Sequence, residues 1–376
     1  MQSLSAQTDS TTVKTTWILP TVTTEATTFN SANFSPSQAP QTNSATSPQT
    51  TTSALTATAT KIITASATQT TTSRPELNEK NLIGYWGQDT VYFDSGKVQG
   101  SLLSYCQSNN WDYINLSFMS EFSGGSNNYQ LNFANFGDYD TTAITSTSSE
   151  AMLSIGSDIM ACQKLGVKIF LSLGGATGGY SVLAGTGSSF ATLLYNSFFS
   201  GSSTLPRPFG QAVLDGIDWD IEANIGSQSD VITTNQKLKV LEPGIMISAV
   251  PQCPFPDAYV GEAVGNADAE FDFISVQFYN NFCALSSGSS SFNFNAWAAG
   301  ISFPIAIALP GSPRSASNGL ATITQITQAV DDIMLGENSK KFFGLTFWDI
   351  SSVSAYKASG DNSFFVDEAR SLINGL

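Results

Sequence analysis

The sequence has 376 residues, with 30 acidic against 15 basic side chains, a formal net charge of −15 and a pI near 4.2. So acidic a chain lacks the basic surface that binding to nucleic acid or to an anionic membrane requires. It contains no histidine, which excludes Ser-His-Asp and Cys-His catalysis and histidine-ligated zinc and leaves carboxylates, phenols or thiols to carry any chemistry. We expect no metal and no cofactor.

The first 75 residues differ in composition from the rest of the chain. Residues 1–73 contain 34 Ser or Thr and no apolar periodicity that could build a core. We therefore expect residues 1–75 to form a disordered, O-glycosylated, low-complexity arm that precedes a folded domain over residues 76–376. The sequon at Asn33 fits an exposed arm, whereas the sequon at Asn115 falls in a predicted core strand and is expected to be unmodified.

Eight short apolar runs come after the arm, alternating with segments that can form helices. The runs are 82–87, 113–119, 167–175, 216–222, 244–250, 273–279, 304–311 and 342–349. Apolar residues at helical spacing predict helices over 149–165 and 321–335, and a last helix is expected over 363–373. Eight nearly continuous apolar strands alternating with helices predict one closed (β/α)8 TIM barrel. The alternative is an open doubly wound sheet, but no G-x-G-x-x-G turn follows the first run.

The run at 216–222 reads GIDWDIE and holds acids at alternate positions, Asp218, Asp220 and Glu222. Alternate residues of a strand share one face, so these acids would point into the barrel, with Glu222 at the C-terminal end, where barrel active sites open. No Lys or Arg lies between Arg207 and Lys237 to neutralise them locally. Burial and like charges should then keep a proton on Glu222 near neutral pH, as a general acid requires. The alternative is that the acids pair with buried cations or occupy an exposed turn.

Four cysteines bear on the cellular compartment: Cys106, Cys162, Cys253 and Cys283. They are too far apart for a C-x-x-C metal site, which leaves two disulfides or four free thiols, and the even number beside a glycosylation-type arm favours disulfides. No apolar stretch is long enough to span a membrane, and no signal peptide is recognisable. We expect an extracellular or cell-wall-associated protein, with an intracellular location as the alternative because the export route is unexplained.

The segment DGIDWDIE resembles the D-G-x-D-x-D-x-E signature of glycoside hydrolase family 18, and its surroundings resemble the class III, hevamine-like branch of plants and fungi. Other segments agree in order: IGYWGQD, INLSFMSEF, CQKLGVKIFLSLGGATGGY, RPFGQAVLDGIDWDIE, AVPQCPFPD, VQFYNN and GLTFWD. They span about 81–349, the whole predicted barrel, and leave the arm outside. The resemblance implies a chitinase that cleaves β-1,4-linked N-acetylglucosamine with retention, through an oxazolinium formed by the substrate's own acetamido group.

The resemblance also implies roles for individual residues. Glu222 holds the place of the proton donor and Asp220 that of the carboxylate that orients the acetamido group. Asp218 matches the inner acid that shares a proton with Asp220, Tyr279 the phenol that hydrogen-bonds the acetamido carbonyl, and Trp348 the aromatic floor beneath the sugar. Positions that line the cleft align with Tyr85, Gln88, Phe118, Gln277 and Asn280. As alternatives, the aromatic residues would be ordinary core and the amides would make ordinary buried hydrogen bonds.

The resemblance implies that the cysteines pair as Cys106 with Cys162 and Cys253 with Cys283.

Two other functions stay open: a chitin-binding lectin or inhibitor of the same fold that does not hydrolyse, and an endo-β-N-acetylglucosaminidase or lysozyme-type activity. The intact donor position at Glu222 favours hydrolysis, while subsite loops rather than the acids decide the substrate. We expect a monomer whose partner is chitin or a chito-oligosaccharide.

Overall fold

The structure is a computed structural model that describes residues 80–142, 149–202, 207–288 and 290–376. The arm predicted over residues 1–75, with its sequon at Asn33, lies outside these ranges. All eight predicted strands fall within them.

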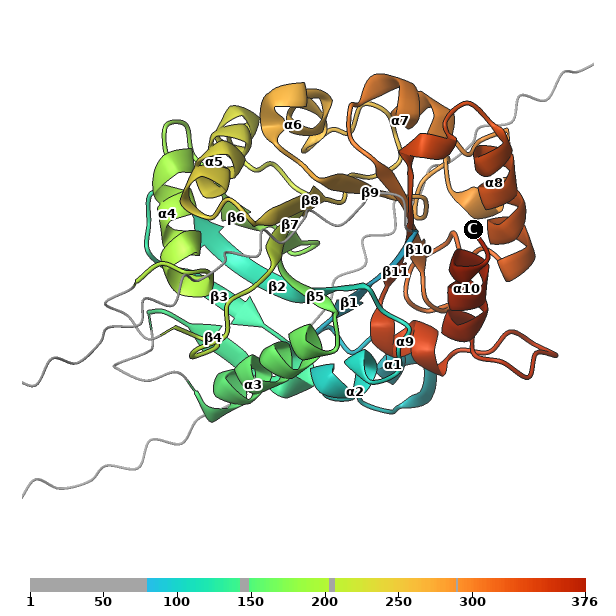
Figure 1. The fold of residues 1–376 in the computed structure, drawn as a ribbon, viewed down its shortest axis with the longest axis horizontal. Coiled ribbons are helices and arrows are strands. Elements are labelled where there is room, and N and C mark those ends of the chain that lie inside the picture. Colours follow the sequence, from blue (N-terminus) through green and yellow to red (C-terminus); the bar gives the residue numbers. More distant parts are fainter. Residues whose placement is uncertain (1–79, 143–148, 203–206, 289) are drawn as a thin grey trace, which may run out of the picture. The chain divides into compact units, whose positions relative to one another are not determined.

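Eight parallel strands close into a barrel with helices around it (Figure 1). The ring closes because β1 pairs in parallel with both β2 and β11. The (β/α)8 fold and the positions of all eight predicted strands are therefore confirmed. In chain order the barrel strands are β1 (Asn81–Trp86), β2 (Tyr113–Ser123), β5 (Lys168–Gly175), β7 (Gly216–Ile221), β8 (Met246–Ala249), β9 (Phe273–Gln277), β10 (Ile305–Pro310) and β11 (Phe342–Trp348).

The three predicted helices are confirmed as α3 (Glu150–Lys164), α8 (Ile323–Leu335) and α10 (Phe365–Asn374). Side-chain caps fix two of their starts: Ser149 accepts a hydrogen bond from the backbone of α3, and Thr322 forms a capping box with Gln325 of α8. None of the helices in the described ranges is long and apolar enough to cross a membrane. The others are α1 (Val91–Ser95), α2 (Leu102–Cys106), α4 (Gly187–Phe198), α5 (Gln228–Leu241), α6 (Gly261–Gly265), α7 (Phe294–Gly300) and α9 (Ile350–Ala355), with 3-10 turns at Ala134–Phe136, Ala267–Ala269, Leu285–Ser287 and Ser339–Lys341.

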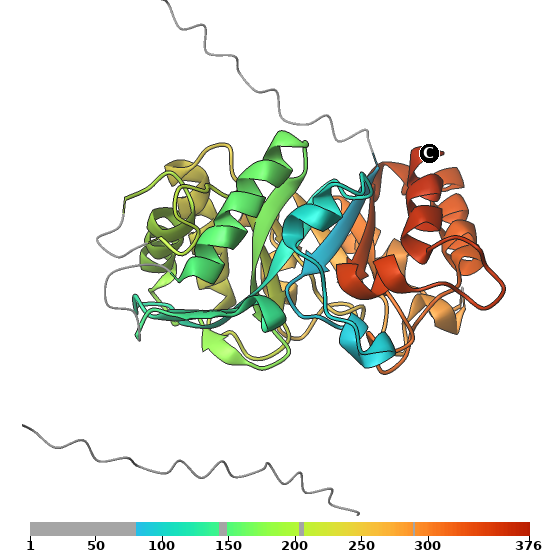
Figure 2. The same ribbon diagram turned by 90° about the horizontal axis from the view of Figure 1, so that it is seen from below.

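An additional hairpin extends the barrel beyond the predicted strands. The strand β2 runs to Ser123, four residues past its predicted end, and its extension pairs antiparallel with β3 (Tyr129–Asn132), which pairs in turn with β4 (Asp138–Asp140). A short strand β6 (Gly179–Ser181) pairs with the same extension. Figure 2 shows the hairpin at one end of the barrel, to the side of the ring. This hairpin forms a wall beside the C-terminal end of β2.

The interior of the barrel is built in layers whose order follows from the alternation along each strand. The bottom layer is apolar and contains Ile83, Tyr113, Phe170, Phe273, Ala306 and Phe343. The top layer is largely aromatic and contains Tyr85, Phe118, Val250, Tyr279 and Ala308, with Trp348 packed against it. Between them lies a buried polar layer, which we call the middle layer and which comprises Asn115, Ser172, Asp218, Ser248, Ser275 and Thr346. The buried polar groups of the barrel interior are thus concentrated directly beneath its upper end.

The two disulfides that the resemblance implied are present. Cys106 of α2 is bonded to Cys162 of α3, with 5.4 Å between Cα atoms. Cys253 is bonded to Cys283 at a Cα separation of 5.9 Å, which ties the loop after β8 to the loop after β9. The sequon residue Asn115 is 1% exposed, as expected for a core strand.

Candidate active site

A cleft of about 530 Å³ opens at the C-terminal ends of the barrel strands. The side chains of its floor come from β1, β2, β7, β9 and β11, and one wall is the β3–β4 hairpin. Asp218 lies below the cleft and is fully buried. The other predicted catalytic and sugar-binding residues all line it: Tyr85, Gln88, Phe118, Asp220, Glu222, Gln277, Tyr279, Asn280 and Trp348.

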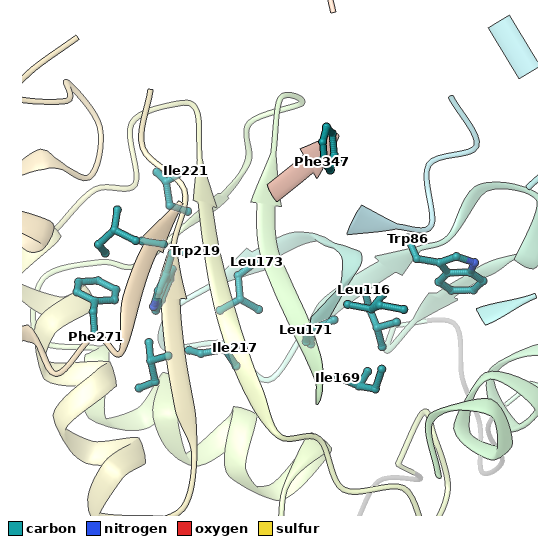
Figure 3. Close-up of a cluster of buried hydrophobic side chains, with 14 of the residues drawn as sticks. Trp86, Leu116, Ile169, Leu171, Leu173, Ile217, Trp219, Ile221, Phe271 and Phe347 are labelled. Atoms are coloured by element: carbon teal, nitrogen blue, oxygen red, sulfur yellow. The ribbon is translucent and has the colours of Figure 1, made fainter. Parts of the chain in front are cut away.

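The strand β7 presents its acids to the barrel interior and its apolar residues to the helices. Ile217, Trp219 and Ile221 belong to the core between strands and helices, where Figure 3 shows them together on one side of the sheet. The indole N–H of Trp219 donates to the side chain of Asn235 in α5 at 2.9 Å, which fixes the orientation of the indole toward the helices. Because side chains alternate along a strand, the acids face the opposite way, and Glu222 comes directly after the last strand residue.

Three hydroxyl groups hold Asp218 in the middle layer. Tyr85 donates to its Oδ2 at 2.7 Å, Ser172 to the same atom at 2.9 Å, and Ser248 to Oδ1 at 2.6 Å. Burial raises the pKa of Asp218, while these three hydrogen bonds act to lower it. No hydrogen bond joins Asp218 to Asp220 in the described part of the chain, so the proton shared between them stays a prediction.

Asp220 lies one layer above, at the base of the cleft, and is 4% exposed. The side-chain amide of Gln277 donates to its Oδ1 at 3.3 Å and to the carbonyl of Val250 at 3.0 Å. Burial raises the pKa of Asp220 well above its usual value, and the charges of Glu222 and Asp218 raise it further. Asp220 is therefore suited to carry a proton while its neighbours are charged.

Glu222 is less buried than the two aspartates, and its position is fixed through its backbone. Its N–H donates to the hydroxyl of Tyr180 at 2.9 Å, and that hydroxyl donates to the carbonyl of Gly175 at 3.0 Å. Burial raises the pKa of Glu222 and the charge of Asp257 adds to the rise, whereas a hydrogen bond with Gln277 acts to lower it. These effects favour the protonated form of Glu222 compared with an exposed glutamate.

The aromatic residues complete the cleft around these acids. Tyr279 is 8% exposed, and burial followed by the charges of Asp220 and Glu222 raises the pKa of its phenol well above the usual value. The phenol therefore stays protonated and able to donate a hydrogen bond. Trp348 stacks on Phe118, with 5.6 Å between ring centroids and 24° between planes, which fixes the orientation of its indole.

Two of the predicted cleft residues also brace loops. The side-chain amide of Gln88 donates to the carbonyls of Ser117 at 2.8 Å and Asn132 at 3.2 Å, which joins β2 to the hairpin. The side-chain oxygen of Asn280 accepts from the backbone of Ser317 at 2.9 Å, and its own φ is +57°. Gln88 and Asn280 therefore line the cleft and also hold its shape through these hydrogen bonds.

Several residues of the site were not predicted from the sequence. The hairpin residues 130–132 and 138–140 line one wall of the cleft, together with Gly175, Ala176 and Thr177. Ser172 and Ser248 could have been found, because each is a polar residue at an inward position of an otherwise apolar strand. Within the described ranges, no three acidic or cysteine side chains are grouped so that they could hold a metal ion.

Comparisons with known proteins find sequences and structures similar to the barrel. Residues 81–347 match the family model described as glycosyl hydrolases family 18. The chain is 36% identical over 314 residues to "Chitinase 1" of Rhizopus niveus, an alignment that covers 81% of this chain and 60% of that protein. The chain thus spans less than two thirds of the length of this curated relative.

Two solved structures are also similar to the barrel. A chitinase from Ipomoea carnea superposes with a TM-score of 0.62 at 27% identity and covers 78% of this chain and 99% of that one. A xylanase and α-amylase inhibitor protein from Scadoxus multiflorus superposes with a TM-score of 0.61 at 28% identity, over 79% of this chain and 98% of that one. Similar barrels therefore include both a chitinase and a protein described as an inhibitor.

Proposed function

The chain belongs to the glycosyl hydrolases of family 18, and from that membership we propose that it is a chitinase, which hydrolyses the β-1,4 linkages of chitin and chito-oligosaccharides. The observation that carries the proposal is the placement of Glu222, with its raised pKa, near Asp220 and Tyr279 in a cleft at the C-terminal end of the barrel. An acid in such a place can protonate a leaving oxygen, and aromatic residues around it suit a sugar ring.

In the proposed first step, Glu222 donates its proton to the glycosidic oxygen as the bond to the anomeric carbon breaks. Its raised pKa supports this role, because a general acid must hold its proton at the working pH. The hydrogen bond from its backbone to Tyr180 fixes the backbone of Glu222, whose side chain lines the cleft. After the leaving group departs, the Glu222 carboxylate takes a proton from the incoming water.

The nucleophile in the proposal is the acetamido oxygen of the sugar itself, as in substrate-assisted glycosidases. Attack by this oxygen on the anomeric carbon forms an oxazolinium, and Asp220 orients the amide through its N–H. The phenol of Tyr279 donates to the acetamido oxygen, and its persistent protonation supports that role. Two inversions at the anomeric carbon, first by the amide and then by water, give net retention.

The proposed place of action is outside the cell or in the cell wall. Two disulfides support it, since such bonds persist in oxidising compartments. The substrate, chitin, is a neutral polymer. A strongly acidic protein would repel an anionic polymer but does not repel a neutral one.

A second candidate function is sugar or protein binding without hydrolysis. The likeness to a xylanase and α-amylase inhibitor protein favours it. The intact acid at Glu222 argues for hydrolysis, because a binding protein does not need a proton donor.

The experiment that separates the two is a time course on chito-oligosaccharides of defined length, with the wild type and Glu222→Gln. The amide is nearly isosteric with the acid but cannot protonate a leaving group, so we expect cleavage by the wild type and a loss of about 10²-fold or more in the variant, with oligosaccharide binding retained. Binding by both proteins without cleavage by either would favour the second candidate. Near wild-type cleavage by the variant would show that Glu222 is not the donor.

A further inference from the structure

Asn115 is an unusual residue of the middle layer. It lies in β2, is 1% exposed, and neither its Oδ1 nor its Nδ2 has a hydrogen-bond partner. Burying a polar group without a partner costs about 1–3 kcal/mol, and leucine, of nearly the same size, would avoid that cost. The other polar side chains of this layer are satisfied: Ser172 and Ser248 donate to Asp218, and Ser275 pairs with Thr346 at 2.9 Å.

The strand register places Asn115 directly beside Tyr85. The two residues are partners in the parallel pairing of β1 with β2, and both side chains face the barrel interior. The Tyr85 hydroxyl donates to Asp218 at 2.7 Å. Burial, above all, raises the pKa of the Tyr85 phenol, and the neighbouring side-chain amide of Asn115 acts to lower that pKa.

We propose that Asn115 is a positioning residue that acts through Tyr85 to hold the tyrosine proton on Asp218. This inference rests on the proposed function. A phenol oxygen can accept one hydrogen bond while it donates its single proton elsewhere. When the amide N–H of Asn115 points at that oxygen, the hydroxyl proton is left for Asp218.

The effect of Asn115 on Tyr85 is passed to the substrate through Asp218 and Asp220. A hydroxyl directed at Asp218 stabilises its negative charge in a fully buried place. The charge on Asp218 in turn favours a proton on Asp220, one layer above. A proton on Asp220 removes one negative charge from beside Glu222, so Asn115 can affect the chemical step without touching the sugar.

The same layer offers a matched control. Ser275 is also 1% exposed, but its hydroxyl pairs with Thr346 and not with the acids of β7. Ser275→Ala therefore disturbs the polar packing of the layer without disturbing Tyr85. A residue whose role is packing alone should behave as Ser275 does.

The test is a double-mutant cycle on chito-oligosaccharide hydrolysis with Asn115→Leu, Tyr85→Phe and the combined variant, and melting temperatures measured for each. We expect Asn115→Leu to lower kcat about 10-fold in the wild-type background, with KM changed by less than about two-fold. In the Tyr85→Phe background the same change should lower kcat by less than about two-fold, because the group through which Asn115 acts is gone. If the leucine variant does not fold, the cycle is repeated with Asn115→Ser, which keeps a small polar side chain.

Equal losses from the Asn115 change in both backgrounds would overturn the inference and leave the proposed function intact. The inference would also be overturned if Asn115→Leu lowered the melting temperature and left kcat unchanged, which is the behaviour expected of Ser275→Ala. A wild-type chain that cleaves no chito-oligosaccharide would contradict the proposed function, and the inference with it.

Discussion

Opposing effects act on the pKa of Glu222. Burial and the charge of Asp257 raise its pKa, while the hydrogen bond with Gln277 opposes them. Asp257 is 6% exposed, and its carboxylate accepts hydrogen bonds from the backbone N–H groups of Tyr259 and Val260, both at 2.8 Å. Asp257 is thus a buried charge, held in the loop after β8, that acts on the proton donor from a distance.

Replacing Asp257 with asparagine should shift the pH profile. Removal of the negative charge lowers the pKa of Glu222, and the donor is active only while protonated, so the alkaline limb of kcat should move to lower pH. The asparagine side-chain oxygen can still accept the two backbone hydrogen bonds made by Oδ1, and the hydrogen bond from the Gln252 N–H to Oδ2, at 3.1 Å, is lost. The measurement is kcat against pH on a soluble chito-oligosaccharide.

Glu262→Gln is the matched control for this shift. It removes one negative charge from α6, which comes after the same loop, at an exposed residue that does not act on the Glu222 pKa. An unmoved alkaline limb in Asp257→Asn, or an equal shift in both variants, would show that Asp257 does not tune the donor.

At this scale the sequence predicted the acids but not their partners. The alternation in GIDWDIE placed Asp218 and Asp220 inside the barrel, because side chains alternate along any strand. The hydroxyls that hold Asp218 come from Tyr85, Ser172 and Ser248, at sequence separations of 133, 46 and 30. Such contacts depend on the relative register of neighbouring strands, which no local pattern encodes.

At the scale of elements, the two disulfides have different relations to the cleft. The bond from Cys106 to Cys162 joins two helices on the outside of the barrel. The bond from Cys253 to Cys283 joins the loops that come after β8 and β9 and that carry Asp257 and Asn280. Stability and catalysis should therefore respond differently to the loss of each.

We expect removal of either bond by paired Cys→Ser changes to destabilise the barrel by similar amounts, about 2–4 kcal/mol. The closed loops differ by less than a factor of two, with sequence separations of 56 and 30, so the entropic terms are similar. At temperatures well below the melting temperature, only loss of the Cys253–Cys283 bond should also lower kcat/KM. Denaturant unfolding and oligosaccharide kinetics at 25 °C measure the two effects.

Each double variant serves as the control for the other. If the variant lacking the Cys106–Cys162 bond lost as much activity as the variant lacking the other bond, the loops after β8 and β9 would have no special dependence on their disulfide.

The elements of the barrel were largely predictable, and the hairpin was not. The eight runs are nearly continuous stretches of apolar residues, and their helices carry clear periodicity, as in α8. The hairpin strands β3 and β4 have only four and three residues and are separated by a 3-10 turn. Patterns this short do not distinguish a strand from a loop, so the wall of the cleft emerged only with the structure.

At the scale of the whole molecule, the barrel should be catalytically self-sufficient. Its first strand begins at Asn81, and Lys80 donates to the carbonyl of Phe342 at 2.7 Å, so a chain that starts at Glu76 keeps every contact described for the barrel. We expect this chain to match the 376-residue chain in kcat and KM on soluble chito-oligosaccharides.

The comparison is repeated on insoluble chitin, with the same two proteins. A difference confined to the insoluble polymer would assign residues 1–75 a role in attachment or spacing. A collapse of activity on soluble oligomers would mean that the catalytic domain does not begin near residue 76.

The central claim is that the substrate's acetamido oxygen is the nucleophile, with Glu222 as acid and Asp220 and Tyr279 holding the amide. The most direct test is proton NMR of the earliest products from a chito-oligosaccharide, recorded before the anomers equilibrate. Attack by the acetamido group and then by water retains configuration, so β-anomers should appear first. If α-anomers appear first, water attacks the anomeric carbon directly, and the roles assigned to Asp220 and Tyr279 are wrong.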